Sequence, residues 1–146
     1  YQRTENTEQS EMADFLFRNG TDAIIGSHPH VVQPIRLNED GKLAVYSMGN
    51  MISNQRKRYT NGGILVEMTL VKKDSVEISD YAYLPIWVHK PSTPKGTAFS
   101  LVPANSDSIY WEDMSIGSED AKAMKLFLKD KRKNLPGISE KVIEMN

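Results

Sequence analysis

The sequence contains no cysteine, which excludes disulfides, thiolate metal sites and a cysteine nucleophile. It has no apolar run approaching the roughly 20 residues that a membrane-spanning helix needs, and no signal peptide is visible. The formal net charge is only -1, so the charge balance does not indicate nucleic acid or an anionic membrane surface as a partner. The remaining composition, 39% apolar and 25% charged in 146 residues, is typical of one globular domain with a hydrophobic core.

Two helices are predicted where apolar residues recur at helical spacing. The first covers residues 7–19, with a cap at Asn6 or Thr7 and a stop at Gly20. Its expected apolar face consists of Met12, Ala13, Phe15 and Leu16. The second begins at a Ser118 cap and runs to about Lys129. Its expected apolar residues are Ala121, Met124, Leu126, Phe127 and Leu128.

The end of the chain is less regular in its pattern. Residues 131–134 are expected to break the second helix, and residues 138–145 to form a weaker final helix or a tail.

Apolar or alternating segments predict strands at residues 23–26, 31–37, 43–48, 64–71 and 76–87. The first is expected to be buried, and the next two to form a hairpin around the Asp40-Gly41 turn. Residues 53–63 have no periodicity and are expected to be a mobile basic loop, while residues 90–105 should cross the surface irregularly with local extended pieces. The pattern therefore predicts an α/β (α+β) domain with a mixed or antiparallel sheet and flanking helices.

Two of the three histidines, His28 and His30, directly follow the apolar run that ends at Gly26. In extended backbone, side chains at positions i and i+2 leave the same face, and Pro29 favours extended geometry at His28. The two imidazoles can therefore converge on one metal ion or on two adjacent ions. A His-x-His pair is equally typical of surface or hydrogen-bonded structural histidines, so spacing alone leaves both interpretations open.

Other polar residues are weaker candidates. Asn50 could present its amide to a substrate phosphate, or simply stabilise a turn. Arg56 and Arg58 belong to a compact cationic run that could contact an anion, although a solvated loop is the commoner use of such a run. His89 lies at the end of a predicted strand and is expected to be structural or exposed.

Two motifs in fixed order carry a resemblance to a known family. Residues 19–35 (NGTDAIIGSHPHVVQPI), followed by residues 45–53 (VYSMGNMIS), resemble the capsule-synthesis CapA family, also called the poly-γ-glutamate synthesis protein family. That family is similar to the calcineurin-like metallophosphoesterases, whose last metal motif is Gly-His-x-His. His28 and His30 match its two histidines, with Ser27 inserted after Gly26.

The resemblance implies the C-terminal half of a metallophosphatase-like four-layer sandwich, in which residues 90–146 are a family-variable extension. His28 and His30 are then metal ligands, and Asn50, Arg56 and Arg58 are substrate contacts. The full-length protein is expected to hold two divalent ions (Mn, Zn or Fe) as a metal-dependent hydrolase. This chain alone is expected to lack an occupied two-metal centre and to be inactive. Tyr1 is interpreted as the point where a longer chain was cut.

Partners and location are also implied by the family. They are the missing N-terminal half of the polypeptide and an anionic polymer or phosphate-containing substrate, at the cell envelope. Exposed apolar faces are expected to promote homo-oligomerisation. The leading functional hypothesis is a two-metal hydrolase of phosphate esters or similar anionic bonds in capsule or poly-γ-glutamate synthesis or anchoring. The alternatives are a non-enzymatic polymer-binding or assembly component with the same fold, and a small stand-alone binding domain.

Overall fold

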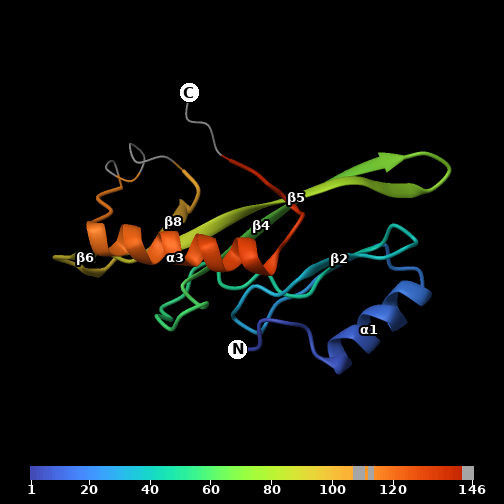
Figure 1. Cartoon of the computed structure of the whole chain (residues 1–146), viewed down its shortest axis with the longest axis horizontal. Coiled ribbons are helices and arrows are strands. Elements are labelled where there is room, and N and C mark those ends of the chain that lie inside the picture. The colour runs from blue at the N-terminus through green and yellow to red at the C-terminus, as the bar shows by residue number, and fades with distance from the viewer. Residues whose placement is uncertain (107–110, 112–113, 143–146) are drawn as a thin grey trace.

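The computed structural model describes residues 1–106, 111 and 114–142 of the chain. Within these residues the fold is mixed α/β, with two helices and two main sheets, as the sequence predicts. In Figure 1 the helix α3 runs along the long β4–β5 hairpin, while α1 lies beside the shorter first sheet. This arrangement is consistent with part of a metallophosphatase-like sandwich. No helix among the described residues combines the length and apolar character needed to cross a membrane.

The first helix, α1 (Thr7–Arg18), begins at the predicted cap. The Asn6 side chain accepts a hydrogen bond from the Gln9 backbone, and the Gln9 side chain accepts one from the Asn6 backbone. The predicted apolar face is partly wrong, because Met12 and Phe15 are each 55% exposed. The helix instead buries Ala13 and Phe17, four residues apart, against Ala44 of the first sheet.

The first sheet has three short strands in the order β1 (Ala23–Ile25), β3 (Leu43–Val45) and β2 (Ile35–Leu37). β1 is parallel to β3, and β2 and β3 form the predicted antiparallel hairpin. The strand predicted over residues 31–37 is shorter than expected, because Pro34 has no amide hydrogen to continue the ladder. β1 is not the buried strand that was predicted. It lies at the edge of the sheet, where Ile25 is 46% exposed.

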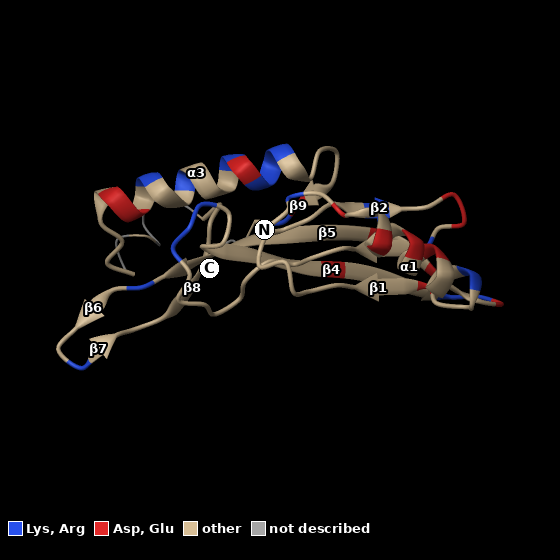
Figure 2. Cartoon of the chain, turned by 90° about the horizontal axis from the view of Figure 1, so that it is seen from below, with Lys and Arg blue, Asp and Glu red and all other residues tan. Residues whose placement is uncertain are grey.

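The second sheet is built on one long hairpin, β4 (Gly62–Lys72) and β5 (Val76–His89), which confirms the second predicted pair of strands. β8 (Ser100–Pro103) extends this sheet on the other side of β5, within the segment that was expected to be irregular. The small hairpin of β6 (Ser92–Thr93) and β7 (Gly96–Thr97) projects from one end of the molecule in Figure 2.

The second helix, α3 (Ser118–Asn134), is longer than predicted and its N-cap is Gly117 rather than Ser118. The expected break at residues 131–134 is wrong, because Met124, Phe127 and Lys131 remain buried and hold the last turns in place. Basic and acidic residues follow one another along this helix in Figure 2.

Of the weaker final helix or tail predicted over residues 138–145, the helix is wrong where the structure describes these residues. β9 (Ser139–Glu140) pairs in parallel with β5, and Lys141 continues this pairing by donating a backbone hydrogen bond to Tyr83. Residues 143–145 of that prediction lie outside the described residues.

One hydrophobic cluster joins the two sheets and the residue that follows α3. Its buried members are Val32, Ile35, Leu43, Val45, Ile64, Tyr83 and Leu135. The backbone also passes from one sheet to the other, because Met48 donates to the Gly26 carbonyl of the first sheet and accepts from the Ile64 amide of the second. The segment after β1 therefore lies where the two sheets meet.

Candidate functional site

His28 and His30 occupy the bend that follows β1. Their φ angles are +95° and +62°, which places both in the left-handed region rather than in the extended backbone predicted from Pro29. Such conformations cost a non-glycine residue on the order of 1–3 kcal/mol and are concentrated at functional sites. Gly26 enters this bend so close to the Tyr46 carbonyl that a Cβ atom would clash with it. The bend brings the two imidazole rings to a centroid separation of 6.3 Å.

Asn50 holds the ring of His30. The Asn50 Oδ1 atom lies 2.9 Å from His30 Nδ1, while the Asn50 Nδ2 group donates to the Thr60 carbonyl at 2.7 Å and to Gln55 Oε1 at 3.0 Å. Asn50 is only 7% exposed. Its predicted contact with a substrate remains a prediction, and both amide hydrogens that would make that contact are already donated within the protein.

A hollow of about 280 Å³ lies beside these residues. His28, His30 and Asn50 contribute its polar side chains, and Met51 and Ile52 are among its apolar ones. The Tyr1 ring approaches His30 at a centroid distance of 6.2 Å, and the Tyr1 hydroxyl accepts a hydrogen bond from Gln55 at 3.4 Å. The hollow is therefore a recess with mixed polar and apolar walls.

The two predicted anion contacts have different surroundings. Arg58 makes a two-pronged ion pair with Asp130 of α3, at 3.0 Å and 2.9 Å, and this pairing raises the pKa of the Arg58 guanidinium. Arg56 is exposed and donates to the Lys90 carbonyl at 3.4 Å. Of the two, Arg56 keeps more of its hydrogen-bonding capacity for an anion.

His89 takes no part in this site. It is 2% exposed, stacks on Trp87 with ring centroids 5.8 Å apart, and places Nδ1 3.4 Å from a carboxylate oxygen of Asp120 in α3. This is the structural role expected of it.

Two imidazoles are part of a metal site but not a whole one. Neutral imidazoles suit Zn, Mn and Fe, so the donor chemistry of His28 and His30 fits the ions implied by the resemblance. Protein metal sites need three or more donors, and no group of three or more His, Cys, Asp or Glu side chains gathers within the described residues. Within the described residues, His28 and His30 are thus a pair of candidate ligands with no third His, Cys, Asp or Glu gathered beside them.

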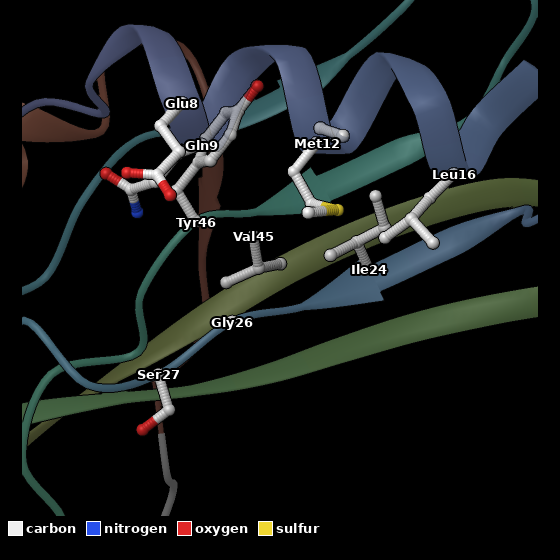
Figure 3. A pocket seen from close by; sticks show the side chains of 10 residues that line it. Glu8, Gln9, Met12, Leu16, Ile24, Gly26, Ser27, Val45 and Tyr46 are labelled. Atoms are coloured by element: carbon white, nitrogen blue, oxygen red, sulfur yellow. The ribbon is translucent and has the colours of Figure 1, made fainter.

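A second, apolar groove of about 300 Å³ runs between α1 and the β1 edge of the first sheet. In Figure 3, Met12 and Leu16 of α1 lie opposite Ile24 and Val45 of the sheet, and Ser27 lies at one end of the groove. Ser27 lines both this groove and the hollow beside the histidines. The predicted homo-oligomer through exposed apolar surface remains a prediction.

Gln55 and Thr60 also belong to the site, although the sequence did not indicate them. Gln55 is five residues from Asn50 along the chain and Thr60 is ten, and the loop between them has no periodicity from which a contact could be predicted. The contacts depend on the loop folding back so that the Thr60 carbonyl faces the Asn50 amide.

Comparison with known proteins covers this same part of the chain. The family model described as "Bacterial capsule synthesis protein PGA_cap" matches residues 1–55, which include His28, His30, Asn50 and Gln55. The "PGA biosynthesis protein CapA" of Bacillus subtilis (strain 168) is 30% identical over 109 residues, or 75% of this chain. The chain belongs to the CapA family.

The match to CapA covers only 26% of that relative, so the chain spans about a quarter of its length. No solved structure matches the chain. The family resemblance predicted from residues 19–35 and 45–53 is therefore confirmed, and the chain is part of the capsule-synthesis class of proteins.

Proposed function

We propose that His28 and His30 are ligands of a divalent metal site in a CapA-family protein that hydrolyses phosphate esters or similar anionic bonds during synthesis or anchoring of a cell-surface polymer. The observation that supports this most is the pair of imidazoles held in left-handed backbone beside a polar hollow, within the stretch that the family model matches. A divalent ion bound there would supply a Lewis acid and an activated water.

The residues around the pair have complementary roles in this proposal. His28 and His30 bind the metal and Asn50 orients His30. Arg56, which lines a different recess from the hollow, neutralises charge elsewhere on an anionic substrate. A complete site of two ions (Mn, Zn or Fe) needs further ligands, which we expect from other residues of a longer CapA-family polypeptide. We place the protein at the cell envelope, in keeping with the capsule synthesis named in its family.

A non-enzymatic role in polymer binding or assembly is the second candidate. It is favoured by one specific observation: the described residues bring together no set of three metal donors. In that role the hollow and Arg56 would bind an anionic segment of polymer without breaking a bond.

Metal binding by this chain is tested with Mn²⁺, which broadens the NMR signals of nearby nuclei. We expect added Mn²⁺ to broaden the ring signals of His28 and His30 selectively, while the buried His89 ring remains sharp as an internal control. The double change His28→Ala and His30→Ala should abolish the effect on nearby backbone signals. Equal broadening at His89, or broadening that survives the double change, would contradict the assigned ligands.

Hydrolysis is tested with the full-length protein, Mn²⁺ or Zn²⁺ and a generic phosphodiester. Activity that falls to background in the same double variant supports the hydrolase. Equal activity in the two proteins would overturn the ligand role, and metal binding without turnover would favour the non-enzymatic candidate.

A further inference from the structure

The orientation of the Asn50 side chain is fixed by a group that can only accept hydrogen bonds. The oxygen and nitrogen of a side-chain amide are assigned from their hydrogen-bond partners. Here the Thr60 carbonyl oxygen lies 2.7 Å from the amide, and an amide oxygen at that distance would be repelled. Nδ2 must therefore face Thr60, which leaves Oδ1 facing His30.

This orientation determines which nitrogen of His30 carries the proton. An amide oxygen has no hydrogen to donate, so a hydrogen bond over the 2.9 Å from His30 Nδ1 requires the proton to be on Nδ1. In a neutral imidazole with Nδ1 protonated, Nε2 holds the free lone pair. Asn50 is 7% exposed, so the accepting side of this bond is largely shielded from water, although His30 itself is exposed.

We propose that Asn50 is a positioning residue that fixes His30 in the tautomer protonated on Nδ1 and so presents the Nε2 lone pair as the metal-binding atom. The use of this lone pair by a metal rests on the proposed function, whereas the tautomer does not. Metal-binding histidines generally donate their second ring N–H to a neighbouring acceptor, which fixes ring orientation and raises the basicity of the ligating nitrogen.

The support extends beyond Asn50 itself. Gln55 accepts the second Asn50 amide hydrogen and in turn donates to the Tyr1 hydroxyl. Both histidines are exposed, but His28 differs because no hydrogen bond to its ring is present among the described residues. The two histidines of the pair are therefore unequal: His30 is set in one tautomer, and His28 is free to exchange between two.

The tautomers are read directly from the ring nitrogen shifts of ¹⁵N-labelled chain, at a pH at which the imidazoles are neutral. We expect a protonated-type Nδ1 and an unprotonated-type Nε2 at His30, and averaged signals at His28. Asn50→Ala should move His30 to averaged signals like those of His28.

Asn54→Ala is the matched control, since Asn54 is an exposed asparagine in the same loop, and it should change nothing. The His89 signals show whether each variant is folded. If Asn50→Ala does not fold, the unaltered chain still decides: a proton on His30 Nε2, or averaged His30 signals, overturns the proposal. A tautomer that persists in folded Asn50→Ala overturns it too.

Zn²⁺ titration separates this inference from the proposed function. We expect Zn²⁺ to shift the His30 Nε2 signal, and Asn50→Ala to weaken the affinity by roughly 10- to 100-fold. A fixed tautomer with no response to Zn²⁺ would contradict the metal site and leave the positioning role standing. A response to Zn²⁺ with unchanged affinity in Asn50→Ala would support the metal site and overturn the positioning role.

Discussion

The two sheets of this chain differ in strand length, exposure and backbone strain. The first sheet has strands of three residues, exposes its β1 edge and carries the histidine bend with its two left-handed residues. The second is a hairpin with strands of 11 and 14 residues, covered by α3 through the buried side chains of Met124 and Phe127. The strained, solvent-accessible histidine bend therefore lies on the small first sheet, and the larger and more regular second sheet supports it.

The largest expected effect is the loss of packing between α3 and the second sheet. Phe127 is 2% exposed and lies against the Gly62 backbone at the start of β4, so Phe127→Ala should lower the free energy of unfolding by about 3–5 kcal/mol. Leu126→Ala is the matched control. Leu126 is the next residue before Phe127 but is 44% exposed, so its replacement should lower the free energy of unfolding by less than about 1 kcal/mol. Denaturant unfolding measures both variants. Equal losses would contradict the view that the buried face of α3 supports the second sheet.

An intermediate effect depends on pH and again belongs to α3. Burial lowers the pKa of Lys131 from 10.5 to about 8, assisted by nearby Arg3 and opposed by Asp130. Between about pH 8 and 10.5 the unfolded chain binds more protons than the folded chain, so stability should rise with pH. The gain over this range is on the order of 3 kcal/mol.

Lys131→Met should abolish this rise and make the chain more stable near neutral pH. Thermal unfolding of the two proteins across this pH range checks the prediction. A stability that still climbs in Lys131→Met would show that another group is responsible.

The smallest effect tests the strain in the first sheet. Because His28 has a φ of +95°, His28→Gly should raise stability by about 1 kcal/mol, whereas His28→Ala should leave the strain in place. The same His28→Gly chain should bind Mn²⁺ more weakly. If His28→Gly is no more stable than the unaltered chain, the backbone at His28 is not strained.

Much of the second sheet could be predicted from the sequence because its signals are local. The alternation in residues 76–79 and the polar turn that precedes it mark the hairpin, and the capping box at Asn6 marks the start of α1. What could not be predicted depends on contacts distant in sequence. The exposure of β1, the extra turns of α3 and the strand at Ser139 are decided by which surface each meets after folding.

The candidate site was predictable in its residue types and not in its geometry. The His-Pro-His spacing, with the family motifs, indicated His28 and His30, but Pro29 suggested extended backbone where the structure has a left-handed bend. The sequence indicates Asn50 as a substrate contact because a side-chain amide can donate hydrogen bonds to a phosphate. Its partners at Thr60 and Gln55 are visible only once the loop is folded.

One side chain at the end of α3, outside the residues that the family model matches, contacts two segments that lie inside them. The Asn134 amide donates to the Val32 carbonyl, two residues after His30, and to the Arg3 carbonyl in the first residues of the chain. The match to the family model ends at residue 55, so α3 contains none of the residues that this family model matches. A relative that replaced this helix would need a different donor for the Val32 carbonyl, and exchange of the C-terminal segment between family members would therefore have to preserve this one position.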